Sequence, residues 1–376
     1  MTKRLILTYL TGLTMGFGGA AMADSSTYGV AALPPEMLRQ PAAETCPALR
    51  SGIYRLITPT LGGRMSDQTG KSVLDAARLE FTHSDGSRSH WEAKGNCRFT
   101  DLGGNGYSVD YVVSQAGVLV GRVSVNGGSS NRMAFGFPEQ THALEELAGT
   151  WNTLGLRYAP ERFYAEGGHL TFNRWGATNA ATVCNNPDSW AIDACTVVAP
   201  PALAGIGPYV PDSGGGFTHK SDSRTSRLFL YRAAAGLAML AGIDSEGSFF
   251  LGTTSAAMEM PPVGRTATAW NLDMTGRLES ATSTYVNTNT VVSVDLRQKT
   301  WTRNKKNAGV PDEHIEPMLA DRPRPGYFTR LGGDGPTPNG STIHFNEFIA
   351  LYLPGMGVFP ALLPTIKLFE ISVLQP

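Results

Sequence analysis

Charged residues are scarce in this chain, and neither sign dominates. Asp, Glu, Lys and Arg together make up 17% of the 376 residues, and the formal net charge is −1. Loss of an N-terminal leader containing Lys3 and Arg4 would leave a small acidic excess. Nonspecific nucleic-acid binding needs a broad basic surface. The composition therefore argues against a nucleic-acid partner.

The sequence patterns of familiar catalytic nucleophiles are also missing. No Gly-x-Ser-x-Gly elbow occurs. The segment from Asp212 to Gly215 resembles the serine motif of trypsin-like proteases, but Pro211 precedes it and none of the seven histidines lies in the setting that accompanies that motif. Because Asp, Ser and Gly are strong turn formers, we predict a glycine-rich turn here and name no catalytic residue.

Metal-binding patterns are equally sparse. Neither Cys-x-x-Cys nor His-x-x-x-His, the tight pairs typical of zinc sites, is present. Possible ligands cluster from Asp312 to His314 and at Glu316. Adjacent residues of an extended chain point to opposite sides, however, and no further ligand set accompanies them. We predict no metal site and no cofactor.

The first residues have the pattern of an export signal. Lys3 and Arg4 provide a positive end, the run from Leu5 to Ala21 is mostly apolar, and Ala21-Met22-Ala23 matches a small-x-small cleavage site. We predict cleavage after Ala23 and a periplasmic or secreted protein.

Only four cysteines are present, and all follow the predicted signal. An even number in an oxidising compartment predicts disulfides, for which three pairings are possible. We favour Cys46 with Cys97, which would tie the start of the first unit to an inner strand. The other pair would then be Cys184 with Cys195, which would close a short loop.

Abundant glycine and proline predict strands rather than helices. The chain has 43 glycines and 24 prolines, and its best amphipathic helical segment, His142 to Leu147, is barely two turns long. The β-branched and aromatic content of four segments is typical of strands. These segments are Tyr107–Val113, Leu119–Val125, Leu228–Arg232 and Ser248–Gly252.

Part of the sequence is repeated. The segment from Val112 to Gly121 is echoed by Leu230 to Gly242, and a Gly-x-aromatic start precedes each, at Gly52-Ile53-Tyr54 and at Gly149-Thr150-Trp151. A repeat of roughly a hundred residues built from short apolar runs indicates two similar β units. We predict an all-β protein of two related antiparallel units, each a barrel or sandwich, with a C-terminal β extension. The expected division is a signal peptide (1–23), an extended leader (24–45), a first β unit (46–142), a second β unit (143–257) and the extension (258–376).

Gly149-Thr150-Trp151 resembles the opening strand of lipocalins and the wider calycin barrels, where a Gly-x-Trp begins the barrel and the tryptophan plugs its closed end. The resemblance implies an up-and-down barrel with a cavity for a small ligand. As ligand-binding candidates we take the aromatic and cationic side chains expected near such a pocket. They are Trp91, Trp151, Trp175, Tyr231 and Arg232. Alternation places Tyr231 and Arg232 on opposite faces of their strand, so at most one of them points inward.

Two further segments are candidates for contacts. Arg297 to Arg324 is rich in charge and is predicted as a solvated connection, with an anion-facing or partner-facing loop as the alternative. Phe348 to Ile366 is uncharged, but Pro354, Pro360 and Pro364 would break a membrane-spanning helix. We predict buried segments there, or an apolar patch for an envelope protein partner, and no transmembrane span.

The sequence favours an exported, non-catalytic binding or structural protein that holds an apolar or amphipathic small molecule or a partner protein. One alternative is an envelope hydrolase or isomerase with a histidine or carboxylate in a β-barrel pocket. Another is a surface adhesion or assembly component. A cavity lined by convergent acids and histidines would favour the enzyme, and an apolar cavity would favour the binder.

Overall fold

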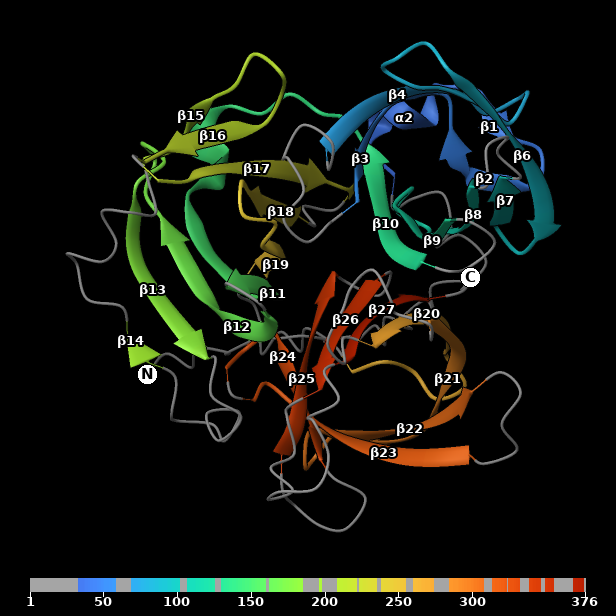
Figure 1. The fold of residues 1–376 in the computed structure, drawn as a ribbon. Coiled ribbons are helices and arrows are strands. Elements are labelled where there is room, and N and C mark those ends of the chain that lie inside the picture. Colours follow the sequence, from blue (N-terminus) through green and yellow to red (C-terminus); the bar gives the residue numbers. More distant parts are fainter. Residues whose placement is uncertain are drawn as a thin grey trace, which may run out of the picture.

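In a computed structural model of the protein, most of the described residues lie in strands (Figure 1). The description covers residues 33–58, 69–101, 107–125, 130–159, 162–184, 196–197, 208–221, 223–234, 238–254, 260–273, 284–307, 313–322, 324–331, 338–345, 349–354 and 368–374. The predicted all-β class is confirmed. A two-stranded ribbon is followed along the described chain by three larger antiparallel sheets.

The first unit is a closed barrel of eight strands (Figure 1, blue to teal). The strands are β3 (Gly52–Ile57), β4 (Thr69–Asp75), β5 (Glu80–Thr82), β6 (Arg88–Gly95), β7 (Arg98–Asp101), β8 (Tyr107–Val113), β9 (Leu119–Val125) and β10 (Ser130–Pro138). Neighbours in sequence pair with each other, and β10 pairs with β3 to close the ring. Helix α2 (Pro35–Leu38) and a ribbon of β1 (Ala42–Ala43) with β2 (Cys46–Arg50) precede the barrel.

Aromatic side chains form the core of this barrel. The ring of Trp91 stacks on Phe81 at 4.3 Å and on Tyr111 at 4.7 Å between centroids. Such pairs contribute about 1 kcal/mol each beyond their buried area. The disulfide predicted between Cys46 and Cys97 is confirmed, and it ties β2 to the tight turn between β6 and β7. The second predicted pair remains a prediction, because Cys195 lies outside the described residues.

The second unit is a curled nine-stranded sheet (Figure 1, green to yellow). Its strands are β11 (Gly149–Ala159), β12 (Arg162–Phe172), β13 (Thr178–Cys184), β14 (Thr196–Val197), β15 (Val210–Pro211), β16 (Phe217–Lys220), β17 (Thr225–Arg232), β18 (Ala238–Asp244) and β19 (Phe249–Thr254). The last strand, β19, pairs with the first, β11, as in the barrel. The 3₁₀ helix η3 (Leu144–Leu147) leads into β11 and lies within the best amphipathic candidate segment of the sequence, His142 to Leu147.

The two units share the local structure that the sequence repeat predicts. Gly52 and Gly149 begin β3 and β11 with positive φ angles of 150° and 130°, which favour glycine. Two residues later an aromatic side chain donates a hydrogen bond to the carbonyl four residues before it. Tyr54 Oη donates to Arg50 O at 3.0 Å, and Trp151 Nε1 donates to Leu147 O at 2.9 Å. The echoed segments form the hairpins β8–β9 and β17–β18.

The C-terminal extension closes into a second eight-stranded barrel (Figure 1, orange to red). Its strands are β20 (Thr266–Asp273), β21 (Thr284–Asp295), β22 (Thr300–Asn307), β23 (Glu313–Ala320), β24 (Tyr327–Leu331), β25 (Pro338–Phe345), β26 (Ile349–Pro354) and β27 (Leu368–Leu374). The charged segment Arg297 to Arg324 therefore contains two strands rather than one solvated connection. Arg303 is buried on β22 and bonds Glu316 of β23, because the register places these two residues opposite each other.

Hydrogen bonds from buried side chains join the units. Tyr231 Oη of β17 donates to the carbonyl of Ala116 in the first barrel. Between the sheet and the second barrel, Tyr327 Oη donates to Thr153 O at 3.1 Å. These tyrosines are nearly inaccessible, at 0% and 3% exposure. The three sheets therefore pack against one another through specific polar contacts.

Candidate functional site

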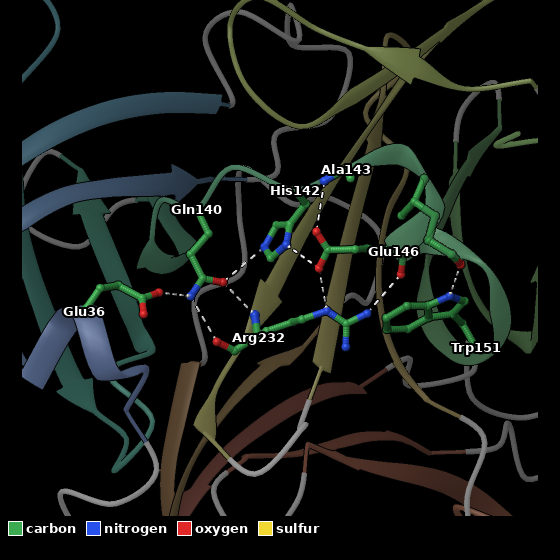
Figure 2. Close-up of polar contacts among 8 residues, drawn as sticks. Glu36, Gln140, His142, Ala143, Glu146, Trp151 and Arg232 are labelled. Atoms are coloured by element: carbon green, nitrogen blue, oxygen red, sulfur yellow. Dashed lines mark hydrogen bonds and ion pairs between the residues drawn. The ribbon is translucent and has the colours of Figure 1, made fainter. Parts of the chain in front are cut away.

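A cleft of about 460 Å³ lies where the first barrel meets the nine-stranded sheet (Figure 2). Its lining comes from the start of helix α2, from the connection between β10 and η3 with part of η3, and from the end of β17. The lining residues are Pro34, Pro35, Glu36, Glu139, Gln140, Thr141, His142, Glu146, Arg232 and Ala233. Prolines and an alanine thus form an apolar part, and ionisable side chains form a polar part.

Gln140 connects the three elements around the cleft. Its Nε2 donates to Glu36 Oε1 of α2 at 3.2 Å and to the carbonyl of Arg232 at 3.0 Å. Its Oε1 accepts the backbone N–H of Arg232 at 2.8 Å. The side-chain amide therefore pairs with both backbone groups of Arg232, much as a neighbouring strand would.

His142 lies beside Gln140, and only 9% of its side chain is exposed. Its Nε2 is 3.1 Å from Gln140 Oε1, and its Nδ1 is 3.0 Å from Glu146 Oε2. Both ring nitrogens consequently face oxygen atoms inside the protein, as Figure 2 shows.

Glu146 anchors the polar end of the cleft. Its Oε1 accepts the N–H of Ala143 at 2.9 Å, and its Oε2 accepts Nε of Arg232 at 3.0 Å. Burial raises the pKa of this carboxyl, but the Ala143 N–H, His142 and the charge of Arg232 outweigh it, so the pKa lies below its usual value. Glu146 is therefore ionised at neutral pH.

A second ion-pair group borders the cleft at Glu139. Arg55, only 2% exposed, binds both Glu139 oxygens at 2.9 and 2.6 Å and also donates to Gly214 O at 2.6 Å. Its guanidinium lies over the ring of Phe229. Asp212 accepts a hydrogen bond from the N–H of Gly214. The segment that resembles a protease motif is therefore a turn, and its Gly214 carbonyl accepts a hydrogen bond from Arg55.

Several polar groups of the cleft are already paired with one another. Catalysis by His142 as a general base would need a ring nitrogen within reach of a substrate proton. Both nitrogens are instead occupied by Gln140 and Glu146. Three groups of the cleft can form hydrogen bonds with a ligand: the exposed carboxylate of Glu36, the exposed Thr141 hydroxyl and Nη1 of Arg232. In Figure 2 this Nη1 points away from Glu146.

The structure does not bring the five predicted ligand-binding residues together. Trp91 is in the core of the first barrel, Trp151 is in the core of the sheet, and Tyr231 bonds Ala116. Trp175 is 63% exposed on the turn between β12 and β13, with Arg174 over its ring. Arg232 lines the cleft, while the preceding residue Tyr231 is buried.

Sequence reasoning missed the other polar residues of the cleft. His142 and Glu146 are four residues apart in a segment predicted to be helical, a spacing that indicates a contact. The pairing of Gln140 with Arg232 spans 92 residues and leaves no local pattern. In the described part of the chain, no group of three or more His, Cys, Asp or Glu side chains is arranged to hold a metal ion. None of the helices described has the length and hydropathy of a membrane span.

Comparison with known proteins yields only distant structural similarities. No family model matches the sequence, and no curated protein matches it. A protein of unknown function of the DUF3598 family from Nostoc punctiforme has 9% identity and a TM-score of 0.22, over 63% of this chain and 99% of that one.

Two structures of transferrin-binding protein B are also similar. The protein from Neisseria meningitidis has 11% identity and a TM-score of 0.26, over 89% of this chain and 68% of that one. A variant from Haemophilus parasuis has 10% identity and a TM-score of 0.26, over 86% of this chain and 76% of that one. Similarities at this level transfer no ligand or partner to this chain.

Proposed function

We propose that this chain is an exported, non-catalytic binding protein that holds an amphipathic small molecule in the cleft between its first barrel and its nine-stranded sheet. The observation that carries the proposal is the cleft itself, whose volume of about 460 Å³ falls within the usual range for small-molecule sites. Such sites form preferentially at the junction of two units.

The lining of the cleft suits an amphipathic ligand. Pro34, Pro35 and Ala233 provide an apolar wall for the ligand body. Glu36 and Arg232 provide an acceptor and a donor of opposite charge that can orient a polar end. The disulfide between Cys46 and Cys97 supports export, since such bonds persist in oxidising compartments.

Native mass spectrometry of protein purified from its own source, before and after denaturing extraction, tests this proposal. We expect a stoichiometric small molecule that disappears on denaturation. Thr141→Trp should abolish that species, because Thr141 lines the cleft and is exposed, so a large side chain there fills the space without removing a hydrogen bond described above.

Ser84→Trp is the matched control, because Ser84 is exposed on the turn between β5 and β6, outside the cleft lining. It should retain the ligand. A ligand-free wild-type protein, or a ligand held equally by both variants, would contradict binding in the cleft.

A further inference from the structure

We infer that protonation of His142 controls a joint, meaning the hydrogen bonds of Gln140 that connect α2 to β17. These bonds hold while His142 carries two ring protons, and they break when it loses one. The inference concerns the regulation of the proposed binding site and rests on the proposed function for its link to a ligand. The contact geometry itself is independent of any ligand.

The orientation of Gln140 is fixed by its partners. The backbone of Arg232 offers one donor and one acceptor, and they meet opposite ends of the Gln140 amide at 2.8 and 3.0 Å. Rotating the amide by half a turn would oppose two donors at one end and two acceptors at the other. Its nitrogen also donates to the carboxylate of Glu36. The atom that faces His142 Nε2 is therefore an oxygen.

This orientation determines the protonation state of His142. Nε2 faces the Gln140 oxygen, which is an acceptor, so it must carry a proton. Nδ1 faces the ionised carboxylate of Glu146, which is also an acceptor, so it must carry a proton as well. An imidazole with both nitrogens protonated is a cation. The arrangement thus selects the charged form of His142.

The charged groups around the ring fit this assignment. Glu146 of η3 touches the ring, and Arg232 of β17 reaches the same Glu146 oxygen from the other side at 3.0 Å. Glu36 of α2 adds a second carboxylate through Gln140, and Glu139, whose charge is shared with Arg55, lies at the edge of the cleft. The carboxylates therefore balance the positive charges of His142 and Arg232.

Loss of one proton would place two acceptors against each other. A neutral ring has one unprotonated nitrogen, which would meet Gln140 Oε1 or Glu146 Oε2 at about hydrogen-bond distance, and buried contacts of this kind are costly. Relief requires Gln140 or Glu146 to turn away, and we assign this movement to Gln140, because Glu146 is also held by the N–H of Ala143 and by Arg232. Turning Gln140 breaks its bonds to Glu36 and Arg232, which connect α2 to β17. Histidine side chains in general change charge between about pH 5 and pH 8, so this is the range in which the inference is tested.

Nitrogen-15 NMR of the histidine rings in the ligand-free protein tests the inference. At about pH 5 both His142 nitrogens should give signals of protonated ring nitrogens, and by about pH 8 one should give the signal of an unprotonated nitrogen. Over the same range, the hydrogen-exchange protection factor of the Arg232 amide should fall by about tenfold, or about 1.4 kcal/mol, since its partly buried hydrogen bond to Gln140 would be lost. His142→Gln assigns the signals.

Glu146→Gln removes the negative charge beside the His142 ring while keeping a side chain of similar size. Removing the carboxylate beside the ring should lower the His142 titration midpoint by about one pH unit, because an opposite charge favours the protonated form. Glu92→Gln, an exposed acid on β6, should leave the midpoint unchanged. The exposed ring of His90 serves as the internal reference in every spectrum.

A single ring proton on His142 at about pH 5, or constant Arg232 protection across its titration, would overturn the inference. These outcomes are separable from the proposed function. A ring that titrates as expected in a protein without ligand upholds the joint and removes the binding proposal. A bound ligand beside a ring with one proton does the reverse.

Discussion

At the scale of single residues, two histidines at unit junctions have opposite electrostatic surroundings. His142 lies between acceptors at the first junction. His169 of β12 lies at the second junction, where the Arg324 guanidinium and Thr182 both contact its Nδ1. Since a guanidinium can only donate, this nitrogen is an acceptor and the ring is neutral. Burial, together with the charge of Arg324, lowers the pKa of His169 from 6.5 to about 4.

The lowered pKa of His169 predicts a loss of stability in acid. The unfolded chain binds a proton at this histidine near pH 6.5, whereas the folded protein does so only near pH 4. The stabilisation is therefore complete above about pH 6.5 and is lost as the pH falls toward 4. Urea unfolding at a series of pH values measures it. His169→Gln should flatten the slope in this window, and His90→Gln should preserve it. Equal slopes in both variants would contradict the assignment.

At the scale of elements, each echoed hairpin places a glycine against an aromatic ring of the neighbouring strand. Gly121 of β9 is opposite Tyr111 of β8, and Gly242 of β18 is opposite Phe250 of β19. A β-carbon built on Gly242 would lie 2.1 Å from the Phe250 ring, and one built on Gly121 would lie 2.5 Å from the Tyr111 ring. The glycines thus leave space for the rings to cross over the strand.

Gly242→Ala should destabilise the protein by about 1–3 kcal/mol, because the partly buried Phe250 ring, which packs against the core of the sheet, must move. Gly70→Ala is the control, since a β-carbon at this position of β4 would meet no atom within 4 Å. The free energy of unfolding, from urea titration, should change little in the control. Equal losses in the two variants would show that strand propensity, and not the ring contact, sets the effect.

The disulfide fastens the entry ribbon to the first barrel. Cys46 and Cys97 are 51 residues apart. Closing a loop of that length lowers the conformational entropy of the unfolded chain, which stabilises the folded state by about 4 kcal/mol. The double variant Cys46→Ala with Cys97→Ala should lower the free energy of unfolding by a similar amount. Reduction of the wild type with dithiothreitol should reproduce the loss. A variant as stable as the oxidised wild type would contradict this role.

Strands could be predicted from the sequence where neighbouring residues alone determine the structure. Strand-type residues at Tyr107–Val113 and Leu119–Val125 predicted β8 and β9 with the bounds they have in the structure. The repeated Gly-x-aromatic start predicted two related units, and the structure gives a physical reason for its glycine, since Gly52 and Gly149 both have positive φ angles. Closure of the third sheet was not predicted, since the pairing of β20 with β27 depends on residues about a hundred positions apart.

At the scale of the whole molecule, the candidate site belongs to no single unit. Only Arg232, among the predicted ligand-binding residues, lines the cleft. The sequence predicts Trp91 and Trp151 as pocket aromatics, and the structure places both in packed cores. A sequence shows which side chains are large and polar, but contacts between Gln140 and Arg232 arise only once two sheets have docked. Function at such a junction therefore depends on packing between the units.

The central claim about this molecule is that the cleft holds a ligand. The measurement that tests it most directly is a crystal structure of the protein purified from its own source without denaturation. We predict electron density for an amphipathic molecule between the proline wall of Pro34 and Pro35 and the charged pair Glu36 and Arg232. A cleft that holds only water, with a molecule bound inside the second barrel or nowhere, would contradict the account.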